Sequence, residues 1–213
     1  MDIARIAELL APFTSGETPT RLLEQLQSYL DLLLRWNARV NLTGIRDPEA
    51  IVTRHFGESL FAARILLRGG PESAVLSTLA DVGSGAGFPG IPMKLFAPEL
   101  QLTLIESRHK KAAFLREVLR SLGIEGAQVF SGRAEQWAKT ADVVTLRAVE
   151  KFEHAFPVAA NLVAKNGKLG LLIGAGQVPI ALRALAGNWK YDEAVVVPRS
   201  DTRVVMVGRR RCN

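Results

Sequence analysis

A glycine-rich segment directly after a short apolar run places the strongest constraint on the fold of this 213-residue chain. The segment reads LADVGSGAGFPGIP over residues 79–92 and has four glycines between positions 83 and 90. Glycines after a strand let the backbone pass close to a ligand and take conformations that side chains forbid. The segment therefore predicts a strand, a ligand-binding turn and a helix that starts late or irregularly, because Pro89 and Pro92 interrupt its beginning.

Short apolar segments alternate with helical ones after residue 77, which is typical of a parallel sheet covered on both faces. The predicted strands are 78–82, 101–107, 127–132, 141–147 and 167–176. A basic amphipathic helix is predicted over 108–124. Residues 189–210 hold two β-rich runs separated by a few polar residues, which predicts an antiparallel hairpin. The chain is therefore predicted to form an α/β fold.

The first 70 residues are predicted to be helical. Thr18-Pro19 and Asp47-Pro48 each predict an N-cap with proline at the first helical position. Leucines recur at helical spacing after the first signal, and an amphipathic run continues to Leu67 after the second. We expect a helical N-terminal extension over 1–70 and a single compact sheet domain over 71–213.

The charge balance favours a polyanionic partner, although a merely soluble basic surface is the alternative. The chain has 27 Lys and Arg against 21 Asp and Glu, a formal net charge of +6. No apolar run approaches the ~20 residues that span a bilayer. Cys212 is the one cysteine, which excludes internal disulfides and cysteine metal sites. We expect a cytoplasmic protein with no membrane segment and no metal site, because His109 and His154 also lack partners at ligand spacing.

Three ligands are compatible with a glycine-rich turn: a dinucleotide, a nucleoside triphosphate and S-adenosylmethionine. The literal G-x-G-x-x-G pattern of dinucleotide sites occurs at 85–90. The strand, however, is predicted to end near Val82, which makes Gly83 the first turn glycine and puts Phe88 where a small residue belongs. No Gly-Lys-Ser/Thr follows to hold phosphates and a metal. S-adenosylmethionine, which has no phosphate, is the remaining candidate.

Acidic residues at the strand ends support that choice. Asp81 closes the first strand, and Glu106 closes the second, 23 residues after Gly83. A carboxylate at Glu106 accepts hydrogen bonds from both ribose hydroxyls, while the alternative is a solvated residue at a strand end. A sheet that ends in an antiparallel pair is typical of methyltransferases. An NAD(P)-dependent oxidoreductase and a non-enzymatic RNA-binding module are the competing interpretations.

Six segments together resemble one bacterial family, the small-subunit (16S) ribosomal RNA guanine-N7 methyltransferases, also called the glucose-inhibited division protein B family. The joint occurrence of WNxxxNLT, RHxxES and GxGxGFPGIP is more specific than any glycine turn alone. The segments are LLLRWNARVNLTGI (32–45), RHFGES (54–59), DVGSGAGFPGIP (81–92), ESRHKKAAFLREV (106–118), GRAEQW (132–137) and LRAV (146–149).

The resemblance implies a class I S-adenosylmethionine-dependent methyltransferase with a Rossmann-like sheet, an antiparallel C-terminal hairpin and an N-terminal helical extension. Residues 71–213 would then be the methyltransferase domain. The implied activity is methylation of N7 of one guanine in 16S rRNA, with S-adenosyl-L-methionine as cofactor and the assembled 30S particle as substrate. Nothing in the sequence demands a dimer, so we expect a monomer.

The resemblance also implies positions of cofactor contact. They are Gly83 and Phe88 in the turn, Ala134 and Glu135 after the third strand, and Arg147 after the fourth. Glu58 stands where the family more often has aspartate.

The residues themselves add Gly85 and Glu106 as cofactor-binding candidates. Arg147 is the candidate catalytic residue, because an arginine at a strand end can contact guanine, RNA phosphate or the cofactor carboxylate. A surface salt bridge is the alternative role.

Guanine N7 carries a free lone pair in the major groove, so attack on a methyl sulfonium needs no deprotonation. The chemistry can rest mainly on positioning that lone pair in line with the S–CH3 bond. The sequence lacks an Asn/Asp-Pro-Pro-Tyr motif, and Cys212 lies at the terminus. We therefore hypothesise that no general base is obligatory.

Two polar groups in the helical extension admit two interpretations. Arg54, His55 and Glu58 form a polar patch, and Asn37 and Asn41 are spaced one helical turn apart. The patch either lines a cofactor or RNA entrance or forms a buried hydrogen-bond network against the sheet domain.

Aromatic and basic residues complete the candidates. Phe130 and Trp137 are expected in the core, with base stacking as the alternative role. Two basic clusters are possible RNA contacts, the second of which is alternatively a disordered tail; the clusters are Arg108, Lys110 and Lys111, and Arg209, Arg210 and Arg211.

Overall fold

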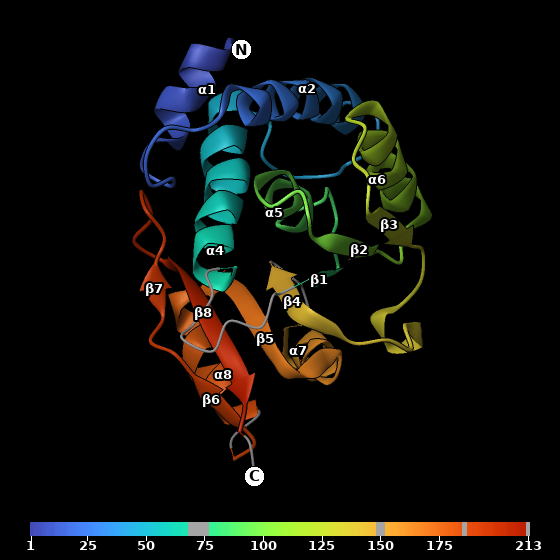
Figure 1. Cartoon of the computed structure of the whole chain (residues 1–213), viewed down its shortest axis with the longest axis vertical. Helices are drawn as coiled ribbons and strands as arrows, with labels where there is room; N and C mark the ends of the chain where they lie inside the picture. Colours follow the sequence, from blue (N-terminus) through green and yellow to red (C-terminus); the bar gives the residue numbers. More distant parts are fainter. Residues whose placement is uncertain (68–76, 148–151, 185–186, 212–213) are drawn as a thin grey trace.

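A computed structural model describes residues 1–67, 77–147, 152–184 and 187–211 of the chain. The domain boundary predicted at residue 70 and the predicted role of Cys212 lie outside these residues. In Figure 1 the helix α2 (Thr20–Asn37) crosses the top of the molecule and α1 (Ile3–Leu10) lies at the upper left. The helix α4 (Glu58–Leu66) runs from beside them down to the sheet.

The sheet has the order β3-β2-β1-β4-β5-β8-β6, with β7 paired to β8 off this path. The first five strands pair in parallel, and β8 runs antiparallel to β5, β6 and β7. The predicted α/β fold with terminal antiparallel strands is thus confirmed. The strands are β1 (Thr78–Val82), β2 (Gln101–Ile105), β3 (Ala127–Phe130), β4 (Ala141–Arg147), β5 (Val163–Gly174), β6 (Trp189–Tyr191), β7 (Val195–Val196) and β8 (Arg203–Arg210).

Helices cover both faces of the sheet, and strand residues alternate between two cores as a period of two requires. On β1, Leu79 belongs to the core beneath the N-terminal helices, while Ala80 and Val82 belong to the core on the other face. The remaining helical elements are α3 (Pro48–Ile51), α5 (Gly90–Phe96), α6 (His109–Ser121), α7 (Phe152–Asn161), α8 (Val178–Ala184) and the 3-10 turns η2 (Ala134–Gln136) and η3 (Ala175–Gln177).

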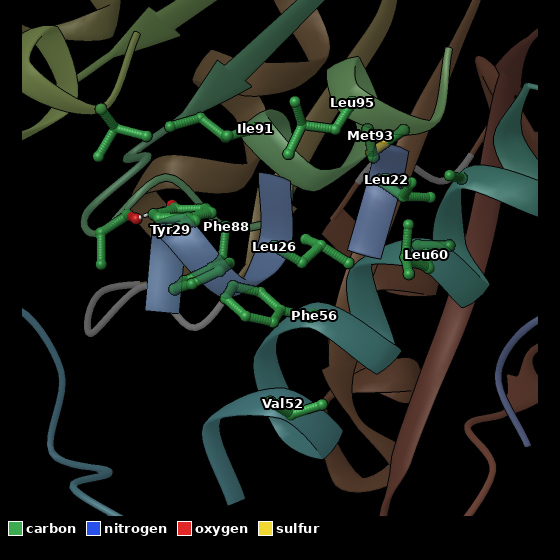
Figure 2. Packing of buried hydrophobic residues seen from close by; sticks show 14 of the residues in the cluster. Leu22, Leu26, Tyr29, Val52, Phe56, Leu60, Phe88, Ile91, Met93 and Leu95 are labelled. Carbon is green, nitrogen blue, oxygen red and sulfur yellow. Dashed lines mark hydrogen bonds between the residues drawn. The ribbon is translucent and has the colours of Figure 1, made fainter. Parts of the chain in front are cut away.

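The N-terminal helices pack into the same core as the sheet. Apolar side chains of α1, α2 and α4 form one continuous cluster with those of β1, β2, α5 and α6. In Figure 2, Leu22, Leu26 and Tyr29 of α2 lie close to Phe88, Ile91 and Met93 of the segment that follows β1. The helical extension therefore forms a wall of the sheet domain's core.

Of the two predicted helix starts, the one at Asp47-Pro48 is confirmed and the one at Thr18-Pro19 is one residue off. Asp47 caps α3, with its carboxylate accepting a hydrogen bond from the Ala50 N–H at 2.7 Å and Pro48 at the first position. The helix α2 instead begins one residue later than Thr18-Pro19 predicts, because Pro19 occupies the cap position without a side-chain hydrogen bond. Between α3 and α4 the backbone widens into a π-helical turn, η1 (Val52–Gly57), a rare form that is often found at functional sites.

Candidate active site

The glycine turn lies at the carboxyl end of β1, where ligands of open α/β sheets bind. Its glycines at 83, 85 and 87 have φ values of +68°, +58° and +92°, which side chains rarely adopt. The N–H groups of Gly83 and Ser84 donate to the carbonyl of Ile105, at 2.9 and 3.1 Å, and so tie the turn to the end of β2. Gly83 is exposed among buried neighbours, which leaves its backbone open to a ligand.

Glu106 sits directly beside this turn. One carboxylate oxygen accepts a hydrogen bond from the Gly85 N–H at 2.9 Å, and the other accepts from the Arg108 N–H at 2.7 Å. The side chain is buried, so the alternative of a solvated strand-end residue is wrong. Because each carboxylate oxygen has two lone pairs, Glu106 retains acceptor capacity for a ligand's hydroxyl groups.

Asp81 lies beneath the turn rather than in it. Its carboxylate accepts hydrogen bonds from the Thr145 hydroxyl at 2.8 Å and from the Gly90 N–H at 3.3 Å, at the start of α5. Complete burial raises the pKa of Asp81 to about 6. Thr145, which the sequence analysis missed, faces Asp81 across the β1–β4 register, and a polar residue inside an apolar strand was the signal for it.

Phe88 points from the turn into the aromatic core. Its ring is stacked on those of Tyr29 and His55, with centroids 5.4 and 4.6 Å apart. Tyr29 is fully buried and donates a hydrogen bond to the carbonyl of Ala86 inside the turn, the dashed contact in Figure 2. A Cβ on Gly87 would collide with that hydroxyl. The N-terminal helix α2 thus shapes the glycine turn directly.

Arg147 ends β4 with its guanidinium buried under the helical extension. Its Nη2 donates to the Glu58 carboxylate at 2.9 Å and to the Arg54 carbonyl at 2.5 Å. The alternative of a surface salt bridge is wrong, because both side chains of the pair are about 5% exposed. Within the described part of the chain, the buried Nε of Arg147 has no hydrogen-bond acceptor.

His55 completes this network from the π-helical turn. Its Nδ1 lies 3.1 Å from Nη2 of Arg147, and its Nε2 lies 2.8 Å from the Thr43 hydroxyl. Because arginine only donates, Nδ1 accepts and the ring proton is on Nε2. Burial and then the charges of Arg147, Arg54 and Arg203 lower the pKa of His55 to about 3. His55 is therefore a neutral member of the network.

The interpretation of the polar patch as a buried network between extension and sheet is confirmed for His55 and Glu58. Glu58 also binds Arg203 at the start of β8, with Nε 2.9 Å from its carboxylate, a partner that the sequence analysis missed. Asn37 is buried and holds the backbone of Leu42 and Thr43. Its predicted pairing with Asn41 on one helix is wrong, because α2 ends at Asn37 and Asn41 is exposed beyond it.

The remaining candidates lie around the same edge. Ala134 is half-buried and Glu135 exposed in η2, the turn that follows β3. Trp137 is buried in the core, and Phe130 packs against that core. Both aromatic residues therefore have the structural role expected of them.

The basic residues of α6 are exposed next to the turn. Arg108 and Lys110 are exposed, and the Lys111 ammonium reaches within 4.0 Å of where a Cβ on Gly85 would lie. The alternative of a disordered tail for the second cluster is wrong for Arg209 and Arg210, which belong to β8. Arg209 pairs with Asp192, and Arg210 lies over the ring of Trp189.

A cavity of about 580 Å³ borders the buried network, between α1, η1 and the loop before β8. Glu58, Arg54 and Arg203 line it. The described residues contain no group of three or more His, Cys, Asp or Glu arranged to hold a metal ion. No helix within them is both long and apolar enough to cross a membrane.

Solved structures share this architecture. The chain is similar to a ribosomal protein L11 methylase from Lactobacillus delbrueckii subsp. bulgaricus, with a TM-score of 0.60 and 16% identity over 75% of this chain and 80% of that one. It is similar to a SAM-dependent methyltransferase from Aquifex aeolicus, with a TM-score of 0.60 and 13% identity over 79% and 96% of the two chains. Together with the strand order, these similarities define a Rossmann-like, class I S-adenosylmethionine-dependent methyltransferase fold.

Sequence comparison identifies the family within that class. The model of the rRNA small subunit methyltransferase G family, GidB, matches residues 22–196. A ribosomal RNA small subunit methyltransferase G from Exiguobacterium sibiricum is 36% identical over 89% of this chain and 83% of the relative. One from Xylella fastidiosa is 43% identical over 81% and 73%. The chain belongs to the rRNA small subunit methyltransferase G family.

Proposed function

We propose that this protein transfers a methyl group from S-adenosylmethionine to N7 of one guanine in the 16S rRNA of the small ribosomal subunit. The observation that carries the proposal is the open glycine turn, held by the buried carboxylate of Glu106 at the ends of β1 and β2, in a chain of this family. N7 as the target atom rests on the family resemblance of the sequence motifs.

The residues at this edge fit S-adenosylmethionine. The exposed backbone of Gly83 offers polar groups, and Glu106 offers acceptors for ribose hydroxyls. The Nε of Arg147, which has no acceptor among the described residues, is a buried donor that suits an anionic or carbonyl oxygen. Gly85, Ala134 and Glu135 lie on the flanking turns. When bound, the cofactor supplies a methyl group made electrophilic by its positive sulfur.

Phe88 contributes to this site in a different way from the turn glycines. Its ring faces the helical extension, stacked on His55 and Tyr29. We infer that it supports the turn from beneath as an apolar wall.

The chain's own task in this reaction is positioning. Guanine N7 has a free lone pair, so no proton must leave before attack. Two buried titratable groups near the turn, Asp81 and His55, are already engaged. Asp81 accepts two hydrogen bonds, and His55 is neutral with both ring nitrogens in contact. We infer that neither acts as a general base and that the protein orients the reactants and excludes water.

Arg147 is proposed to be the residue that touches the reacting groups. Its Nη2 is held by Glu58, Arg54 and His55. These contacts fix the plane of the guanidinium and with it the direction in which the Nε–H points. A charged donor held in this way costs no reorganisation when an oxygen of guanine or of the cofactor carboxylate arrives.

The RNA partner is supported by the basic residues at the start of α6, which are exposed beside the turn. Contacts between these side chains and phosphates would make binding fall steeply with salt. We propose that the substrate is the assembled 30S particle, that the enzyme acts as a monomer, and that it works in the cytoplasm.

Calorimetry with two ligands tests the proposed cofactor. We expect S-adenosylhomocysteine to bind one site per chain and NADH to give no binding heat. Binding of NADH with no response to S-adenosylhomocysteine would instead identify an oxidoreductase, and binding of neither would favour an RNA-binding module.

A further inference from the structure

The cavity of about 580 Å³ beside Glu58 has a charge pattern that the cofactor site does not explain. Four arginines line it: Arg5, Arg54, Arg199 and Arg203. Two of them are already neutralised, since Arg5 pairs with Glu49 at 2.8 Å and Arg203 pairs with Glu58 at 2.9 Å. Positive charge that is not neutralised therefore remains on the other two arginines.

Arg54 and Arg199 are exposed and have no carboxylate partner within the described residues. Arg199 has a φ of +58°, the one non-glycine residue with a positive φ in the described ranges. Such a conformation is uncommon for a side chain other than Asn or Asp. Of the carboxylates that line the cavity, Asp201 is the one that no described arginine neutralises. The cavity therefore has two unpaired cationic side chains, Arg54 and Arg199, against one unpaired carboxylate.

The cavity touches the network around Arg147 through Glu58 and Arg54. Glu58 lines the cavity and binds Arg203 there, and the same carboxylate binds Arg147 at the end of β4. The Arg54 carbonyl also accepts from Arg147, while the Arg54 side chain lines the cavity. A group bound in the cavity thus lies against the residues that hold Arg147.

We propose that this cavity binds a phosphate and ribose of the RNA backbone next to the target guanosine, with Arg54 and Arg199 as the phosphate ligands. This inference rests on the proposed function. The volume lies within the range of about 300–1,000 Å³ that is usual for ligand sites, which is large enough for a nucleotide. Thr53 and Ser200 bring hydroxyl groups to its lining, and Leu9 and Phe13 form an apolar wall.

A divalent cation is a poorer occupant, because the carboxylates of Glu49 and Glu58 are each taken by an arginine. A free phosphate ion has the same chemistry as a backbone phosphate, and the experiment separates the two. Phosphate contacts of these arginines would position the RNA backbone next to the reacting site, without contacts to the bases that read sequence.

The test measures co-sedimentation of Arg54→Ala and Arg199→Gly with purified 30S subunits that lack the methyl group. Arg54→Ala retains the backbone carbonyl that Arg147 uses, and Arg199→Gly suits the positive φ, so both variants should fold. The matched control is Arg21→Ala, an exposed arginine of α2 that lines a cavity near the amino end of β2. Calorimetry with S-adenosylhomocysteine checks that all variants keep the cofactor site.

We expect each cavity variant to lower the affinity for 30S subunits about five- to tenfold at 0.1 M salt and to reduce the slope of log K against log salt by about 0.7–0.9, as loss of one phosphate contact requires. Arg21→Ala should leave both quantities unchanged. Wild-type affinity in both cavity variants, or an equal loss in Arg21→Ala, would overturn the proposal.

Two further readings separate the possible failures. If excess inorganic phosphate at constant ionic strength occupies the cavity while both variants bind 30S subunits normally, the site takes a free anion and the proposal is wrong. If the wild-type protein binds neither S-adenosylhomocysteine nor 30S subunits, the proposed function fails rather than the cavity assignment alone.

Discussion

Among the described residues, Arg147 combines an engaged Nη2 with a buried Nε that has no acceptor. Removing the whole side chain would strip the buried Glu58 carboxylate of a partner, and breaking a buried ion pair costs about 3–5 kcal/mol. Arg147→Ala is therefore expected to destabilise the fold as well as to remove the guanidinium from the site. A substitution that keeps the charge is the cleaner probe.

Arg147→Lys keeps a cation beside Glu58 and removes the Nε donor. We expect kcat/KM for methyl transfer to fall about 10- to 100-fold, since a hydrogen bond from a charged group contributes about 1.5–3 kcal/mol. Arg64→Lys is the matched control, because Arg64 of α4 also has a buried Nε without an acceptor but bonds Phe13 away from the turn. Equal kinetics of Arg147→Lys and wild type would contradict a role at the reacting centre.

His55 makes a prediction about pH and stability. Its pKa is about 3 in the folded protein and about 6.5 when unfolded, so the unfolded chain binds the proton first as pH falls. This group therefore contributes its full stability above about pH 6.5 and loses it toward pH 3, by about 1.4 kcal/mol per pH unit.

The comparison with His55→Gln isolates that effect, because glutamine can donate and accept but does not titrate. The raised pKa of Asp81 has the opposite effect, because the folded protein binds that proton first and gains stability as pH falls from about 6 to the ordinary aspartate value. This effect is the same in both proteins, since both contain Asp81. Urea unfolding at a series of pH values should show a steeper loss of stability in wild type below pH 6. Parallel pH profiles of the two proteins would refute the assignment of a neutral, buried His55.

At the scale of elements, the helical extension and the glycine turn act as one unit. The hydroxyl of Tyr29 on α2 holds the Ala86 carbonyl, and its ring supports Phe88. The extension therefore supports the turn at which we propose that the cofactor binds.

Tyr29→Phe removes only that hydroxyl and leaves the Ala86 carbonyl without its donor. We expect the Kd for S-adenosylhomocysteine to rise about 5- to 10-fold, in line with about 1–1.5 kcal/mol for a neutral hydrogen bond, while kcat at saturating cofactor changes little. Tyr191→Phe is the control, because the Tyr191 hydroxyl is buried without a partner among the described residues. An unchanged Kd together with a lower melting temperature would show that Tyr29 only stabilises the fold.

Helices and strands were predictable from the sequence where an apolar pattern corresponds to residues that are buried in the structure. The bounds of β1 and β4 match the predicted strands, because both are short, mainly apolar runs, and their buried residues carry the strand signal. The fifth strand starts four residues earlier than predicted, at Val163. Val163 pairs with Ala141, the register then shifts before Lys168 pairs with Val143, and the polar residues in between carry no strand signal. The π-helical turn was not predictable, since the sequence of η1 fits an ordinary amphipathic helix.

At the scale of the whole molecule, local sequence patterns predicted the candidate residues at the strand ends but not the long-range ion pairs behind them. Gly83 and Glu106 were predicted from strand, turn and spacing, all of which are local. The pairing of Glu58 with Arg147 joins residues 89 positions apart, and its pairing with Arg203 joins residues 145 apart. Only the packing of the extension on the sheet brings these groups together. The sequence alone therefore could not decide between a buried network and a surface salt bridge for Arg147.

Mapping of the methylated nucleotide tests the central claim most directly. Small subunits from a strain that lacks the gene would be incubated with the purified enzyme and S-adenosylmethionine, and the rRNA would be digested and analysed by mass spectrometry. The account predicts one new 7-methylguanosine at a single position of the 16S rRNA, absent without enzyme. Methylation of another atom, of many guanines or of a ribosomal protein, or no methylation of either subunits or free rRNA, would contradict it.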